Sequence, residues 1–271
     1  MKSWLMIGWC VITGLFGNVS LAQTDSLHRY FHTNGKVASE GSFVNGKPEG
    51  QWKTYFETGV LRSEGGRKNM LLDGVWKFYD ERGRLSNTIS YMDNRKNGPA
   101  ISYDTTGALV SEDSYMDDLR EGVSKTYHGN GSLSREVPYK AGKEEGSGYE
   151  YATDGRIVAL LQYGAGLLRK REDINRVDML GLKQGPWKDF YPNGRVKWEG
   201  SYVDGERQGL FKEYDLQGGL KDMVKYDRGV KDEQASQAQL LDIKRTYHSN
   251  GKVASLGSYS RAGKKEGLFR D

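Results

Sequence analysis

Hydrophobic residues and glycines recur along this chain at a fixed spacing of 24 residues. Because a repeat must be recognised before any motif is interpreted, the units are aligned first. The clearest marker is a glycine within a turn-like stretch, and we take this glycine as position zero of each unit. Two longer gaps, of 39 and 33 residues, interrupt the series in the second half. The nine glycines are Gly35, Gly59, Gly83, Gly107, Gly131, Gly155, Gly194, Gly218 and Gly251.

Large apolar residues keep fixed distances from these glycines. Four residues before zero stands an aromatic residue in every unit: Phe31, Tyr55, Tyr79, Tyr103, Tyr127, Tyr151, Phe190, Tyr214 and Tyr247. Two residues after zero stands an aliphatic one: Val37, Leu61, Leu85, Leu109, Leu133, Ile157, Val196, Leu220 and Val253. Eight residues after zero the residue is aromatic in all units but one, where it is Arg67.

Short segments rich in Tyr, Trp, Thr and Val between glycine turns predict β-hairpins. A two-residue type I′ turn at position zero would force positive φ on residues such as Thr58 and Arg82, which disfavour it. A three-residue loop, made of a type I turn followed by a left-handed glycine, tolerates these residues and accommodates Asp80 at its first corner and Pro192 at its second. We therefore expect this loop in each unit.

The loop sets a cross-strand register in which Tyr55 faces Leu61. Because side chains alternate along a strand, we expect the aromatic at plus eight to share the face of this pair. The opposite face should then carry Trp52, Trp76 and Trp187, with Glu64 opposite Trp52 and Glu199 opposite Trp187.

One hairpin cannot bury these rows alone, so neighbouring hairpins must pair into a continuous sheet. We expect an all-β fold: an elongated, single-layer antiparallel β-meander of 24-residue hairpins, an open solenoid-like sheet with a core of stacked aromatics. The last residues, 267–271, read as the first strand of a tenth hairpin. That strand would close the sheet edge or leave it open for self-association.

Composition supports an extended body more than a compact enzyme. The 271 residues include 36 glycines and 5 prolines, and only 36% are hydrophobic, which is low for a large central core. The formal charge is +4 and falls to +3 without Lys2. This small, scattered charge predicts no nucleic-acid partner.

Residues 1–22 read as a secretory signal peptide. Lys2 precedes an apolar run that is too short to span a bilayer comfortably, and small residues precede a cleavage site between Ala22 and Gln23. An uncleaved anchor is the alternative. The only cysteine, Cys10, lies in this segment, so the processed chain would have no disulfide and no thiol nucleophile. Removal of the apolar run would also leave no transmembrane span. We expect an exported protein that is periplasmic, envelope-associated or secreted.

Units such as YPNGRVKWEGSYVDGERQGLFKEY, at 191–214, resemble the bacterial variant of the MORN repeat found in YwqK-like antitoxin or immunity proteins. The resemblance covers about residues 29–271, apart from two inserts. It implies a sheet of hairpins with a binding role and no family-wide catalytic residue. This chain differs from a cytoplasmic antitoxin because it carries an export signal.

The spacing divides the chain into six parts. These are the signal peptide (1–22), a first array of six units (29–166), an insert (167–184), two further units (185–229), a second insert (230–243), and a last repeat with an edge strand (244–271). Insertions in repeat arrays are often tolerated loops and sometimes bind ligands. Gln, Ala and Leu in the second insert favour a short helix.

The sequence offers no convergent catalytic set. Three of the four histidines, His32, His128 and His248, stand at the same turn corner of separate hairpins, too far apart to act together. Glutamates recur at plus five (Glu40, Glu64, Glu112, Glu136 and Glu199) as a ladder, which predicts charge pairing with lysines and no glycosidase cleft. The Asp93–Asn94 turn is followed by cations and makes a poor calcium loop. No glycine-rich phosphate loop is complete. We predict no enzyme, cofactor or metal.

Four tryptophans are the candidate partner-binding residues: Trp52, Trp76, Trp187 and Trp198. They form an aromatic platform for protein or glycan if exposed, and packed core if covered by neighbouring hairpins. We expect a non-enzymatic scaffold that binds a protein partner in the cell envelope. The alternatives are a YwqK-like antitoxin that neutralises a toxin, and a binder of envelope glycan or polymer through the aromatic face.

Overall fold

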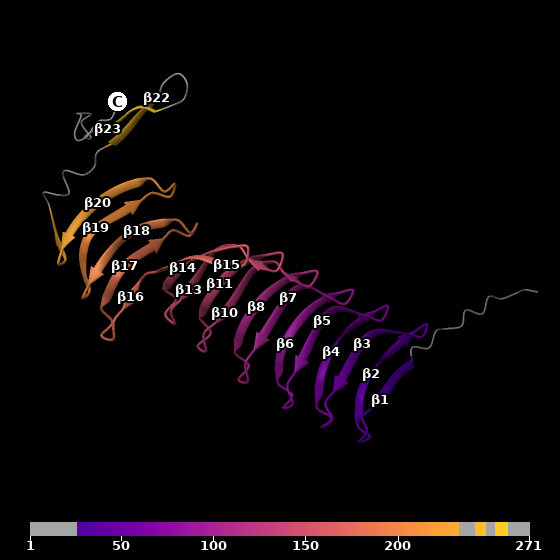
Figure 1. The fold of residues 1–271 in the computed structure, drawn as a ribbon. Coiled ribbons are helices and arrows are strands. Elements are labelled where there is room, and N and C mark those ends of the chain that lie inside the picture. The colour runs from indigo at the N-terminus through magenta and orange to yellow at the C-terminus, as the bar shows by residue number, and fades with distance from the viewer. Residues whose placement is uncertain (1–25, 233–241, 248–252, 260–271) are drawn as a thin grey trace, which may run out of the picture.

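The computed structural model describes residues 26–232, 242–247 and 253–259, and these residues form β-strands and turns without helices. Figure 1 shows strongly curved strands stacked side by side along an elongated array. Strands follow one another in chain order and pair antiparallel with their neighbours. The predicted open, single-layer β-meander of repeated hairpins is therefore confirmed. The predicted signal peptide, its Ala22–Gln23 cleavage site and the turn at Gly251 lie outside the described residues.

Strand bounds follow the repeat. The first sheet contains β1 (Ser26–Phe31), β2 (Val37–Val44), β3 (Lys47–Tyr55), β4 (Leu61–Lys68), β5 (Leu71–Tyr79), β6 (Leu85–Met92), β7 (Arg95–Tyr103), β8 (Leu109–Met116), β9 (Leu119–Arg120), β10 (Gly122–Tyr127), β11 (Leu133–Lys140), β12 (Lys143–Glu144), β13 (Gly146–Tyr151), β14 (Ile157–Gly164) and β15 (Leu167–Asp173). The second contains β16 (Arg176–Val177), β17 (Lys183–Phe190), β18 (Val196–Val203), β19 (Glu206–Tyr214), β20 (Leu220–Asp227) and β21 (Val230–Lys231). A third pairs β22 (Asp242–Tyr247) with β23 (Val253–Tyr259).

The turn inside each described unit is the expected three-residue loop. In the second unit, the Gly59 amide donates to the Phe56 carbonyl at 2.8 Å and the Phe56 amide to the Val60 carbonyl at 2.9 Å. Gly59 has φ of 88°, the left-handed conformation that glycine adopts without steric cost. Tyr55 faces Leu61, as predicted.

The predicted face of the plus-eight aromatic is wrong. Thr54 pairs with Ser63 while Tyr55 pairs with Leu61, so one strand carries an extra residue, a β-bulge, just after the turn. A bulge reverses the alternation of side chains between the two faces beyond it. The plus-eight residues therefore share the face of the tryptophans, as the 5.6 Å ring contact between Trp187 and Tyr202 shows.

The predicted partners of two tryptophans are also displaced by one residue. Trp52 faces Gly65, and Glu64 faces Lys53. Trp187 likewise faces Gly200, while Glu199 faces Lys188. We call the face that carries Trp52, Trp76, Trp187 and the plus-eight residues the tryptophan face, and the face that carries the minus-four residues and the plus-five glutamates the tyrosine face.

Glycine and a large ring complement each other across neighbouring units on the tryptophan face. A Cβ placed on Gly65 would lie 2.3 Å from the Trp76 ring, so only glycine leaves room for the indole. Where the ring is absent, the residue opposite is larger, as with Ile89 opposite Ala100. The same close approach occurs at Gly41 with Trp52 and at Gly200 with Phe211.

The core is a thin layer along this face. Trp52, Trp76 and Trp187 expose only 6%, 3% and 7% of their surface. Around β11 and β14 the buried cluster becomes mainly aliphatic: Val137, Ala159, Leu161 and Tyr163. Stacked aromatics thus make up part of the core, and branched side chains replace them in the middle.

The first insert is structured rather than a loop. Its residues form β15 and β16, and Ile174 and Asn175 between them are buried. The Asn175 amide nitrogen Nδ2 donates to the carbonyls of Ile157 and Lys188, both at 2.9 Å, and its Oδ1 accepts from the Lys188 amide at 2.8 Å. One side chain therefore joins β14 of the first sheet to β17 of the second. Of the second insert, residues 233–241 lie outside the description, and Asp242 and Ile243 belong to strand β22 rather than to the predicted helix.

Candidate functional site: a groove around Trp198

The histidines and the plus-five glutamates serve the array itself. His32 Nε2 lies 3.0 Å from the Tyr55 carbonyl of the next hairpin, and His128 Nε2 lies 2.8 Å from that of Tyr151. They connect adjacent turns and do not converge, as predicted; His248 lies outside the described residues. Among the described residues, no group of three or more acidic, histidine or cysteine side chains could hold a metal ion.

The glutamates bind tyrosines more regularly than lysines. The Tyr79 hydroxyl donates to Glu64 at 2.8 Å, whereas the Lys77 ammonium lies 3.8 Å from the same carboxylate. Each such bond joins the minus-four tyrosine of one unit to the glutamate of the unit before it. The five rungs of this ladder are Tyr55–Glu40, Tyr79–Glu64, Tyr127–Glu112, Tyr151–Glu136 and Tyr214–Glu199.

The ladder predicts a loss of stability at alkaline pH. Burial first, and then the glutamate hydrogen bond, raise the pKa of Tyr55, Tyr79, Tyr127 and Tyr214 from 10.0 to about 12. Because the folded state favours the protonated phenol, the stabilisation is complete below pH 10 and is lost as the pH rises towards 12. We expect tyrosinate absorbance to show a group titrating near pH 12, together with the loss of β-sheet circular dichroism.

A matched pair of variants isolates one rung. Tyr79→Phe removes a hydrogen bond worth about 1 kcal/mol. Tyr103→Phe should cost less, because the unit before it carries Thr88 at the glutamate position. Equal losses in the two variants, measured by chemical denaturation at neutral pH, would show that the ladder is unimportant.

The four candidate tryptophans have different environments. Trp52, Trp76 and Trp187 are covered by neighbouring hairpins, which agrees with the packed alternative. Trp198 is partly exposed on β18 and stacks on Phe211 of β19, with ring centroids 6.1 Å apart and an interplanar angle of 25°. Of the four, Trp198 is the one whose ring surface is available to a partner.

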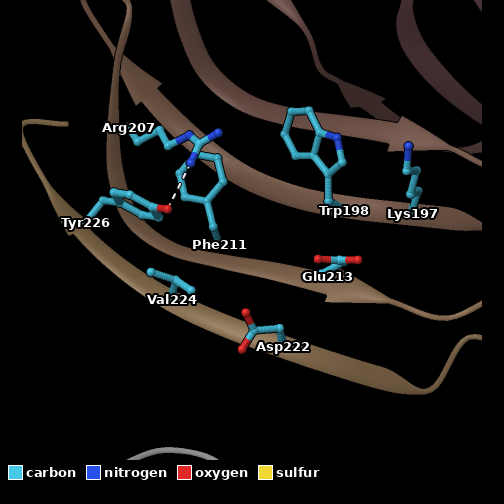
Figure 2. A pocket seen from close by; sticks show the side chains of 8 residues that line it. All are labelled: Lys197, Trp198, Arg207, Phe211, Glu213, Asp222, Val224 and Tyr226. Atoms are coloured by element: carbon cyan, nitrogen blue, oxygen red, sulfur yellow. Dashed lines mark hydrogen bonds between the residues drawn. The ribbon is translucent and has the colours of Figure 1, made fainter. Parts of the chain in front are cut away.

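Trp198 lines a groove of about 330 Å³ across β18, β19 and β20. Figure 2 shows its ring beside Phe211, with Glu213 and Asp222 on successive strands. The register accounts for this order, because Trp198 faces Glu213 and Glu213 faces Asp222. The remaining lining residues are Lys197, Arg207, Val224 and Tyr226.

Most charges in the groove already have partners. The Arg207 guanidinium lies 5.2 Å from the centre of the Phe211 ring and donates to the Tyr226 hydroxyl at 2.8 Å. Glu213 pairs with Lys221 at 2.7 Å. Within the described residues, no lysine, arginine or histidine nitrogen lies within 4.0 Å of the exposed Asp222 carboxylate. The groove therefore presents an aromatic surface with an available negative charge.

The row that contains these residues differs from its equivalents in other units. At plus four, the first six units carry Ser39, Ser63, Asn87, Ser111, Arg135 and Ala159, whereas the next two carry Trp198 and Asp222. At minus five, the first six units carry Tyr30, Thr54, Phe78, Ser102, Thr126 and Glu150, and the next two carry Asp189 and Glu213, so an acidic residue there begins with the sixth unit. Repeat units provide internal controls: residues that the fold requires recur, so a local departure points to a separate role.

Sequence reasoning found Trp198 and missed Phe211, Glu213, Asp222 and Arg207. The signal was present as the departure at plus four, where Trp198 and Asp222 replace the residues of earlier units. It could be recognised only once the bulge showed that the plus-four and minus-five positions share the face of Trp198 and face each other across strands.

On the other side of Trp198 lies a second hollow, of about 320 Å³. It is lined by residues that include Arg156, Asn175, Trp187 and Asp189. The Trp187 indole Nε1 is buried there without a hydrogen-bond partner among the described residues. Trp198 therefore stands between two hollows of similar size at the start of the second sheet.

Comparison with known proteins identifies the repeat. The family model described as "MORN repeat variant" matches residues 25–45, 48–69, 72–93, 120–141 and 183–204. The last four segments each correspond to one hairpin unit with its flanking turns, and together the five matches support a MORN-variant repeat protein. The units between and after them keep the spacing of glycine and aromatics without a match of their own.

No curated protein matches the chain. Solved structures that match the chain include TcdB2–TccC3–Cdc42 (12% identity, TM-score 0.20, 90% of this chain and 17% of that one) and alternansucrase in complex with isomaltononaose (13%, 0.21, 89% and 18%). A porin-like protein from Bacteroides uniformis shows 11% identity, a TM-score of 0.18, and coverage of 90% and 93%. The chain thus spans less than a fifth of the first-mentioned structure, and likeness at these scores implies nothing about function.

Proposed function

We propose that this protein is an exported, non-enzymatic repeat scaffold that binds a protein partner in the cell envelope through the groove around Trp198. The observation that carries the proposal is the local departure from the repeat at Trp198 and Asp222, which the register places on either side of Glu213. The signal-like segment ending at Ala22 supports export. A repeat array with an extended face is suited to binding a macromolecule.

The chemistry of the groove favours a partner segment that carries lysine or arginine. A cation placed over the Trp198 ring gains a cation–π attraction of about 0.5–2 kcal/mol. The Asp222 carboxylate adds charge complementarity, which gives specificity and faster association more than raw affinity. No described strand pairs with the outer edge of β20 from Leu220 to Val224, so an extended segment would add there as a further strand.

A peptide titration tests this function. An extended peptide that alternates lysine and threonine should bind the purified protein and change its tryptophan fluorescence. Asp222→Asn and Trp198→Leu should each weaken binding about three- to tenfold, since tenfold corresponds to about 1.4 kcal/mol. Asp117→Asn, an exposed carboxylate on the turn after β8, is the matched control and should bind as the parent does.

Two outcomes would reject the proposal. Equal binding of a glutamate–threonine peptide would remove the charge argument. Retention of a soluble glycan polymer through Trp198, without binding of the basic peptide, would favour the glycan alternative. A toxin-neutralising role as in YwqK-like proteins rests on the resemblance of the repeat alone.

A further inference from the structure

Strand β20 is the last long strand of the second sheet, and its outer edge is largely open. One side pairs with β19. On the other side, only Tyr226 and Asp227 pair with β21, and the Asp232 amide donates to the Lys225 carbonyl at 2.8 Å. From Leu220 to Val224, no described strand pairs with this edge. Such an edge is a template for another strand.

The chain itself begins a new unit at this edge. The bond from Asp232 to Lys225 repeats the bonds from Glu121 to Ser114 and from Glu145 to Pro138 in earlier units, at 2.9 Å each. There the chain continues at once into β10 or β13. Counted back from Gly251, the equivalent continuation is Asp242, the first residue of β22. In the sequence, residues 233–241 are therefore an insertion. They stand at the repeat position where β9 ends and β10 begins in an earlier unit.

The β22–β23 hairpin has the backbone register of a repeat unit. Thr246 faces Ser255 and Tyr247 faces Val253, with the same shift between them that Thr54 and Tyr55 show in the second unit. An isolated two-stranded hairpin is at best marginally stable in water. It therefore needs a neighbouring strand, and β20 is the strand that precedes it in the repeat order.

We propose that the β22–β23 hairpin docks on the outer edge of β20 as the ninth unit and closes the groove around Trp198. The register follows from the equivalent pair of strands, in which Glu199 faces Lys212. Transferred by repeat position, Met223 faces Arg245 and Asp222 faces Thr246. The hairpin then occupies the open side of the groove that Asp222 and Val224 line.

Charge complementarity supports this occupant. Lys244 stands at the repeat position of Trp76, Trp187 and Phe211, and it is the only lysine or arginine there among the nine units. In the docked register Lys244 falls beside Val224, which lines the groove two residues after Asp222 on β20. The hairpin thus offers the groove the same basic chemistry as the proposed partner. Docking stands without the proposed function, whereas competition with the partner rests on it.

A disulfide test measures docking in the full-length chain, with Cys10 replaced by serine. In Met223→Cys/Arg245→Cys the two residues would face each other, and facing residues about 4.5–5.5 Å apart fall within disulfide range. We expect rapid cross-linking on mild oxidation. The matched control is Met223→Cys/Leu256→Cys, because Leu256 pairs with Arg245 on the far strand, about 4.8 Å further away.

The outcomes separate docking from chance encounter. Fast cross-linking of the first pair with little in the second supports docking in this register. No cross-link, equal rates, or faster reaction of the control pair overturns it. Adding Lys244→Glu to the first pair should slow cross-linking several-fold, because the new charge would repel Glu213 and Asp222.

The same variant tests competition, since Met223 does not line the groove. The reduced protein should bind the lysine–threonine peptide, and the oxidised protein should bind it at least tenfold more weakly. Equal binding by both forms overturns the proposed competition. The cross-linking rates alone then decide whether the hairpin docks. Absence of binding by the parent chain and by the reduced variant, when the first pair also fails to cross-link, rejects the proposed function, because the hairpin then does not cover the groove.

Discussion

Replacing Asn175 with alanine should destabilise the array by about 3–5 kcal/mol, which is at the high end for a single substitution. The side chain is 5% exposed and makes three hydrogen bonds to the backbones of β14 and β17. Each buried group left without a partner costs about 1–3 kcal/mol. Asn175 also has φ of 54°, a conformation that asparagine tolerates better than alanine does.

Because Asn175 joins the two sheets, its loss should also uncouple them. We expect chemical denaturation of Asn175→Ala to resolve two transitions, with Trp187 reporting the second sheet and Trp52 and Trp76 the first. Fluorescence of variants that retain a single reporter would separate them.

Two further variants divide the contributions at Asn175. Asn175→Gly relieves the backbone strain and should recover at most about 1–2 kcal/mol. Asn130→Ala is the matched control, because this exposed asparagine makes comparable turn hydrogen bonds that water can replace. Similar losses for Asn175→Ala and Asn130→Ala would contradict the role of Asn175 as a connection between the sheets beside the Lys188–Glu172 ion pair.

Gly65→Ala should destabilise the first sheet by about 1–3 kcal/mol, the cost of overpacking a well-filled core. The new methyl group would lie 2.3 Å from the Trp76 ring, near the atoms that attach the indole to the chain. The ring cannot yield there by rotating its far end. Its movement would disturb the hydrogen bond from its Nε1 to the Gly66 carbonyl.

Gly129→Ala is the matched control for this substitution. A Cβ at Gly129 would meet no atom within 4 Å, and this glycine lacks the positive φ of the turn glycines. Alanine should therefore be neutral there or stabilise by about 0.4–1 kcal/mol. In a Trp76→Ala background, the cost of Gly65→Ala should largely vanish. A cost that persists there, measured by the denaturation midpoint, would locate the effect in the backbone instead of the ring.

The sequence predicted the repeat well because its signals are local. The turn type followed from which residues tolerate positive φ around Gly59, and this fixed the Tyr55–Leu61 pair. The structure at Ile174 and Asn175 was not predictable in the same way. It depends on which backbone groups of β14 and β17 lack partners, and no spacing rule records that.

The error over the plus-eight residues shows where local reasoning ends. Strict alternation placed Tyr202 with Phe190 and Val196, but the bulge at Lys197 moved it to the face of Trp187. A single extra residue reverses every later side chain in the strand. The candidate site depended on this face assignment, so Glu213 and Asp222 could be grouped with Trp198 only after the register was known.

The sequence by itself determined the repeat length, the turns, the pairing of minus four with plus two, and the open meander, because these follow from residues within one unit. The tertiary structure decided which face each aromatic occupies, which tryptophans are buried, how two sheets join at Asn175, and where Trp198 meets Glu213 and Asp222. These features depend on bulges and on neighbouring strands from other units, whose combined geometry no single unit encodes.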